Sequence, residues 1–178
     1  KNPNLYSGLL TLLPDLQADL AYAVEGYTNT YGNIWRWDIL PTNTEVEAVY
    51  GTLNALIGKC NFLLERIAVL EQEVDDEDYE KLQQFKGEAL FARALSYSDL
   101  IKMYCKAYDP ATAADELGVV LVSSYSNAGT LKRASLKDSY QFVLDDLAQS
   151  ATCLKPDENE NDESYYDTLY FTIYAVNA

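Results

Sequence analysis

The sequence has 178 residues, of which 48% are hydrophobic, which is enough for one domain with a substantial core. Its 28 acidic and 13 basic residues give a formal net charge of −15, which argues against nucleic-acid binding because a phosphate backbone would be repelled. Histidine is absent, which removes the usual general base and the commonest transition-metal ligand. No apolar run approaches the roughly 20 residues of a membrane span.

Three cysteines, at positions 60, 105 and 153, are widely spaced and form no CxxC pair. This spacing gives little support to a zinc or redox site, and we expect Cys60, Cys105 and Cys153 to be buried free thiols. We therefore expect neither a metal nor a cofactor.

In the first third of the chain, leucines recur every three or four residues between positions 5 and 20. This period predicts a first helix that is interrupted or kinked near Pro14. Residues 21–44 lose the period and gain glycine, asparagine and aromatic residues, which predicts a long loop. A second helix follows at about 45–72, where apolar residues form one stripe of roughly seven turns.

An acidic break opens a third helix at about 77–107, and acidic residues suit the positive end of its dipole. Because the connection is short, we expect the second and third helices to pack antiparallel. Residues 108–134 are irregular apart from a β-like run at 118–122, so no substantial sheet is expected. Ser135 and Asp138 resemble an N-capping arrangement and begin a fourth helix.

The C-terminal part of the sequence combines an acidic run with a tyrosine-rich segment. After an acidic run at 157–163, apolar and tyrosine residues between 166 and 176 keep helical spacing, although their types also suit a strand. The stripe is still running at Ala178, so we expect the chain to be cut from a longer protein.

The acidic run also invites a calcium interpretation, because Asp157, Asn159 and Asn161 fit the first ligand positions of an EF-hand loop. Asp162 replaces the turn glycine and Thr168 the closing glutamate, so the sequence favours an ordinary solvated loop.

The third helix carries an arginine within its apolar face, since Arg93 falls beside Ala89 and Leu100 at 100° per residue. A buried arginine must be paired, because an isolated charge there costs several kcal/mol. We expect a structural ion pair with Asp146, at the edge of the fourth helix's stripe; a role of Arg93 in ligand binding is the alternative. Apolar residues on the opposite side of the same helix predict that it is covered on both faces.

Four blocks of sequence, in order along the chain, resemble the SusD-like (RagB/SusD) outer-membrane proteins. GEALFARALSYSDL at 87–100 resembles that family's E-A-x-F-x-R-A-x-x-Y-x-x-L helix, and GVVLV at 118–122 resembles its G-x-P-L-V segment. RASLKDSYQFVLDDL at 133–147 and LNALIGKCNFLL at 53–64 resemble two further helices of the family. Val120 replaces the family's proline, a departure that concerns loop shape.

The resemblance implies an all-α fold of tetratricopeptide-like antiparallel helical hairpins with long irregular loops. It implies a single helical domain over residues 1–178, matching the N-terminal portion of a longer protein. The implied function is a non-catalytic surface lipoprotein of the outer membrane that captures oligosaccharide for a SusC-like TonB-dependent transporter. A lipid anchor would lie upstream of Lys1.

The loop at 21–44 is the best candidate for contact with a glycan. Sugars pack their C–H faces on flat rings and form hydrogen bonds with polar side chains, and the loop offers both in Tyr27, Asn29, Tyr31, Asn33, Trp35, Arg36 and Trp37. Trp35 and Trp37 alternate, so in extended backbone they would share a side. The alternative is that these rings cap the core or are covered by other parts of the protein.

We expect no enzyme activity, because glycoside hydrolysis needs two carboxylates at a defined separation flanking one bond. Adjacent pairs such as Asp145 and Asp146 point to different sides of a helix. The rival interpretation from another class is a helical protein–protein adaptor without affinity for sugar.

Overall fold

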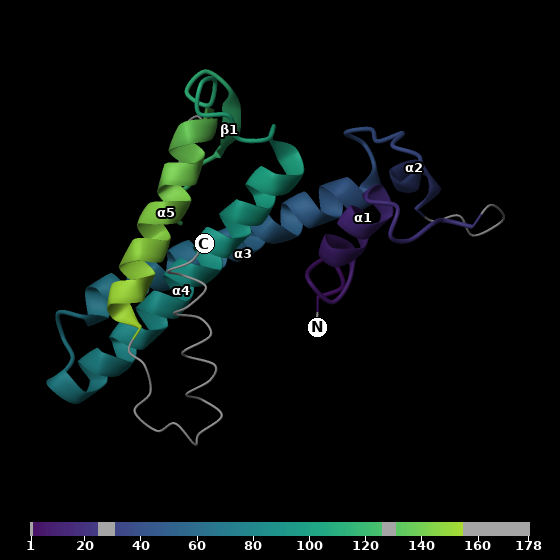
Figure 1. The fold of residues 1–178 in the computed structure, drawn as a ribbon. Coiled ribbons are helices and arrows are strands. Elements are labelled where there is room, and N and C mark those ends of the chain that lie inside the picture. The colour runs from purple at the N-terminus through teal and green to yellow at the C-terminus, as the bar shows by residue number, and fades with distance from the viewer. Residues whose placement is uncertain (1, 25–30, 126–130, 155–178) are drawn as a thin grey trace. The chain divides into compact units, whose positions relative to one another are not determined.

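The computed structural model of the protein describes residues 2–24, 31–125 and 131–154 (Figure 1). It is mostly helical with one small sheet, which confirms the all-α prediction. Contacts between Cα atoms divide the chain into two compact units, residues 1–54 and 55–178. The single domain expected from the sequence stays a prediction. The calcium interpretation of the acidic run and the tail at 166–176 lie outside the described residues.

In the first unit, α1 (Leu9–Gln17) buries Leu10, Leu13 and Leu16, of which Leu13 and Leu16 belong to the predicted stripe. The helix continues through Pro14, so an interruption there was wrong. The leucine period also overestimates its length, since Leu20 is 77% exposed beyond the end of the helix.

The predicted loop at 21–44 contains a short helix, α2 (Gly32–Trp35), which the sequence pattern missed. This helix contacts α1 and buries Ile34, which is 2% exposed. A helix of four residues is too short to show a helical period in the sequence.

The two long helices are α3 (Thr44–Leu70) and α4 (Asp76–Tyr104). In the second unit, Arg93 of α4 donates to Asn61 of α3 at 2.7 Å, and Lys86 of α4 donates to Glu71, just past the end of α3, at 2.9 Å. Residue numbers therefore fall along α4 as they rise along α3, and the helices are antiparallel, as predicted.

A two-stranded antiparallel sheet follows, formed by β1 (Leu117–Val120) and β2 (Arg133–Ser135). β1 overlaps the predicted β-like run, whereas β2 was not predicted. Gly118 is required in β1, because a Cβ atom there would overlap the hydroxyl of Ser139 and the carbonyl of Ser135.

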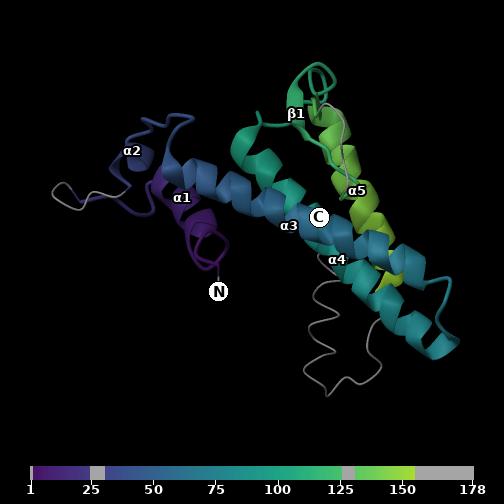
Figure 2. The ribbon, with the colours of Figure 1, turned by 180° about the vertical axis from the view of Figure 1, so that it is seen from behind.

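The last described helix, α5 (Leu136–Cys153), lies beside α4 in both views (Figures 1 and 2). Its N-cap is the predicted one, since the Ser135 hydroxyl accepts a hydrogen bond from the Asp138 N–H at 3.0 Å. Near the other end, the Ser150 hydroxyl donates to the Gly87 carbonyl of α4 at 2.8 Å. A Cβ atom at Gly87 would lie 2.7 Å from Cγ of Leu154, so a side chain there would force the two helices apart.

The three cysteines are free thiols; Cys60 and Cys153 are buried, as expected, and Cys105 is half-buried. Burial raises the pKa of the Cys60 thiol, against an opposing effect of the nearby Arg93 charge. No helix in the described ranges is both long and apolar enough to cross a bilayer.

One ion pair at the turn between α3 and α4 predicts a pH dependence of stability. The hydrogen bond from Lys86 is the largest influence that lowers the pKa of Glu71. A lowered carboxyl pKa in the folded state contributes stability above the unfolded pKa, and this is lost as pH falls below about 4. Glu71→Gln should therefore cost up to about 1 kcal/mol at neutral pH and less in acid. Urea unfolding of wild type and Glu71→Gln from neutral pH to below about pH 4 measures this cost. An equal cost at every pH would contradict the prediction.

Candidate functional site

Five of the predicted glycan-contacting residues gather around α2. Tyr31 occupies its N-cap position, Asn33 and Trp35 lie within it, and Arg36 and Trp37 follow its last turn. Tyr27 and Asn29 lie outside the described residues.

Trp37 sits at the C-terminus of α2 in a backbone conformation that tryptophan rarely adopts. Its φ is +60°, in the left-handed region. Its N–H donates to the Ile34 carbonyl at 3.1 Å, and the next N–H, of Asp38, reaches back to the Asn33 carbonyl at 2.9 Å. These two bonds form the Schellman motif that commonly ends helices, with Trp37 at the position where glycine is usual.

The conformation has a cost and a consequence. A non-glycine residue in the left-handed region carries roughly 1–2 kcal/mol of steric strain. Burial does not compensate for this strain, because the Trp37 side chain is 65% exposed. The motif places a large ring at the surface.

The expectation that Trp35 and Trp37 share one side of an extended segment was wrong. Trp35 lies in the helix and is half-buried, and Trp37 follows in a left-handed turn. Beside them, the Arg36 guanidinium donates to the side-chain oxygen of Asn33 at 3.1 Å. The exposed group is therefore one ring with a neighbouring polar pair.

The C-terminus of α1 provides an internal comparison. Asp19 has φ of +57°, and the Leu20 N–H donates to the Asp15 carbonyl at 3.0 Å, which is the longer bond of the same motif. Aspartate tolerates this region better than tryptophan does, because its short polar side chain can form local hydrogen bonds.

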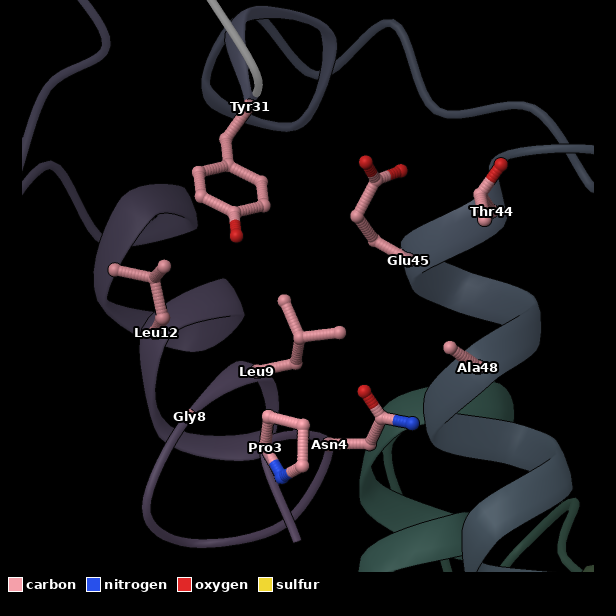
Figure 3. Close-up of a pocket in the computed structure, with 9 residues that line it drawn as sticks. All are labelled: Pro3, Asn4, Gly8, Leu9, Leu12, Tyr31, Thr44, Glu45 and Ala48. Atoms are coloured by element: carbon pink, nitrogen blue, oxygen red, sulfur yellow. The ribbon is translucent and has the colours of Figure 1, made fainter.

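A pocket of about 370 Å³ lies in the first unit, between α1 and the start of α3 (Figure 3). Leu9 and Leu12 of α1 line one wall, and Thr44, Glu45 and Ala48 of α3 line the other. Tyr31 lines it too, so it adjoins the α2 segment. No pattern in the sequence indicates this pocket, because its lining comes from three separate segments.

In the second unit, the structure brings Arg93 and Asp146 together. Arg93 is 8% exposed, and its Nε and Nη2 atoms donate to the two carboxylate oxygens of Asp146 at 2.8 and 2.7 Å. Its guanidinium also lies 5.2 Å from the ring centroid of Phe142. The remaining nitrogen, Nη1, donates to the side-chain oxygen of Asn61 at 2.7 Å, so each guanidinium nitrogen has a protein partner and the geometry favours the structural role over ligand binding.

The same network holds the backbone after β1. Asn61 donates from its amide nitrogen to the Val122 carbonyl at 2.8 Å. The Tyr97 hydroxyl accepts from the Val122 N–H at 2.8 Å and donates to the Val122 carbonyl at 3.1 Å. Asn61 and Tyr97 were not predicted; an asparagine on the apolar stripe of α3 was the available signal.

Each of the four blocks that resemble SusD-like proteins contributes to this network. Asn61 comes from the block at 53–64, and Arg93 and Tyr97 come from the block at 87–100. Val122 comes from the block at 118–122 and Asp146 from the block at 133–147. The matched motifs therefore describe how the helices are joined. They do not describe a catalytic site, and no group of three metal-binding side chains occurs among the described residues.

Comparisons with solved structures agree with this fold. A SusD superfamily protein from Bacteroides thetaiotaomicron superposes with a TM-score of 0.68 at 17% identity, over 95% of this chain and 41% of that one. A SusD superfamily protein from Bacteroides vulgatus gives 0.62 at 20% identity, over 95% and 42%. A candidate sugar-binding protein from the same species gives 0.63 at 22% identity, over 83% and 36%.

The chain thus spans about two fifths of the length of these solved proteins. None of the curated proteins matches it. A family model described as "Starch-binding associating with outer membrane" matches residues 11–177, nearly the whole chain. The match and the helical framework agree: the chain belongs to the SusD-like family.

Proposed function

We propose that the chain is part of a non-catalytic nutrient-binding protein at the cell surface, which captures oligosaccharide for a SusC-like TonB-dependent transporter. The family description, starch binding in association with the outer membrane, supports the ligand class and the location. A lipid anchor upstream of Lys1 would hold the protein at the membrane.

The observation that carries the proposal is the exposed ring of Trp37. The strained backbone at Trp37 presents a ring that is 65% exposed, and so small a buried share does not account for the strain; a ligand contact is the simplest reason for it. An indole face suits the C–H face of a sugar ring, and the Arg36–Asn33 pair beside it can bond to hydroxyl groups. Tyr31 and Trp35 complete the proposed surface among the described residues; Tyr27, also predicted to contact the glycan, lies outside them.

A protein–protein adaptor is the second candidate, and the outer side of α3 favours it. Phe62, Leu63, Val69 and Leu70 are 42–52% exposed there, at spacings that place them along one stripe. Exposed apolar stripes of this kind often mark contact with another protein.

The test measures the affinity of the full-length protein for a panel of oligosaccharides before and after the exposed Trp37 ring is removed. Trp37→Ala should weaken the affinity for the best-binding oligosaccharide roughly ten- to a hundredfold, because a stacked ring contributes about 1–3 kcal/mol of apolar contact. Its Tm should hardly change, since alanine keeps the same strained backbone and little buried area is lost. Titration calorimetry and thermal unfolding measure the two effects.

Tyr79→Ala is the matched control, because Tyr79 is 44% exposed on α4 in the other unit. It should leave affinity unchanged. If no oligosaccharide binds, or if Trp37→Ala lowers Tm while affinity stays the same, the glycan proposal is wrong and the adaptor remains.

A further inference from the structure

The pocket between α1 and α3 is apolar on its α1 side, and its α3 side carries two polar residues, Thr44 and Glu45, beside Ala48. In Figure 3, Leu9 projects from the α1 side and Ala48 faces it from α3. The hydroxyl of Tyr31 points into the space between the helices, and the Glu45 carboxylate lies across from it. Such a pocket suits a small ring with an apolar face and a polar edge, and its volume of about 370 Å³ lies within the usual range for small-ligand sites.

The charge of the pocket is set by Glu45. No lysine or arginine is among the residues that line it, and the Glu45 carboxylate has neither a hydrogen-bond partner nor an ion-pair partner among the described residues. Glu45 lies in the first turn of α3, on the side of the helix that lines the pocket. The carboxylate is therefore an acceptor that remains available to a ligand and repels anions.

We infer that this pocket binds one sugar unit that is neutral or cationic and discriminates against uronic acids, with Glu45 as the residue that determines this specificity. The inference rests on the proposed capture of glycans and adds a ligand class to it. Tyr31 belongs both to the pocket and to the segment around α2 that carries Trp37.

Three monosaccharides that differ in charge test the specificity: D-glucose, D-glucosamine as its ammonium ion and D-glucuronate. We expect the full-length protein to bind glucosamine at least as well as glucose, and glucuronate at least about tenfold more weakly, because two negative charges meet near the protein surface. In Glu45→Gln, the dissociation constant for glucuronate should come within about twofold of that for glucose. Ligand-observed NMR titrations give the three dissociation constants.

Glu47→Gln is the matched control, since it removes the same charge from the same turn of α3 at a residue that does not line the pocket. It should leave the discrimination intact. If both variants relax the discrimination equally, the net charge of the protein causes it and the inference about Glu45 is wrong.

The location of the sugar site is tested by Ala48→Leu, which fills part of the open pocket. This variant should weaken the binding of glucose and glucosamine at least fivefold without lowering Tm. Unchanged binding in this variant would overturn the pocket. If monosaccharides do not respond to Ala48→Leu while oligosaccharides still depend on Trp37, the pocket fails and the proposed function stands. If the pocket binds monosaccharides but oligosaccharide binding does not depend on Trp37, the pocket stands and the proposed ligand surface at Trp37 fails.

Discussion

Arg93→Ala should lower the free energy of unfolding by about 3–5 kcal/mol, because it leaves a buried carboxylate without its counter-ion. Asp146 is 5% exposed and receives two hydrogen bonds from Arg93, so water cannot replace them without opening the contact between α4 and α5. The same change removes a donor from Asn61 and a cation from the face of Phe142. Urea denaturation of wild type and variant measures the loss.

Two further variants separate the buried pair from charge in general. Arg93→Met combined with Asp146→Leu should recover part of the loss, but not all, because the side-chain oxygen of Asn61 still lacks a donor. Lys106→Ala removes an exposed ion pair with Glu116 and should cost less than about 1 kcal/mol. A cost below about 0.5 kcal/mol for Arg93→Ala would show that the guanidinium is not needed to join the helices.

The long helices were predictable because burial and capping act on many residues at once. The stripe of α3 and the Ser135 cap of α5 each follow from side-chain periodicity or from one local hydrogen bond. The buried ion pair of Arg93 was also predictable, because a charge on an apolar face needs a partner from another helix.

The candidate site was predictable in composition and not in geometry. Aromatic and amide residues at 31–37 indicated a sugar-binding surface, but the buried side chain of Ile34 anchors a short helix there that the pattern does not show. Trp37 violates the usual preference for glycine at a helix C-terminus, so sequence propensity argues against the turn that the structure contains. The leucine period failed for a similar reason, because the chain leaves α1 in a left-handed turn at Asp19 while the period continues to Leu20.

Replacing Trp37 by glycine tests most directly whether this strained position serves ligand binding. Glycine adopts positive φ without steric cost, although it gains more entropy on unfolding than other residues do. We therefore expect the free energy of unfolding of Trp37→Gly to stay the same or to rise by up to about 1 kcal/mol. The lost ring should at the same time weaken oligosaccharide binding roughly ten- to a hundredfold.

The decisive measurement sets Trp37→Gly beside Asp19→Gly in the full-length protein, with unfolding free energy and oligosaccharide affinity determined for both. The two variants relieve the same backbone conformation at the ends of α2 and α1. Both should be at least as stable as the wild type, and only Trp37→Gly should lose affinity. Wild-type affinity in Trp37→Gly, or a loss of stability above about 1.5 kcal/mol, would show that the ring serves the fold and that the proposed ligand surface is wrong.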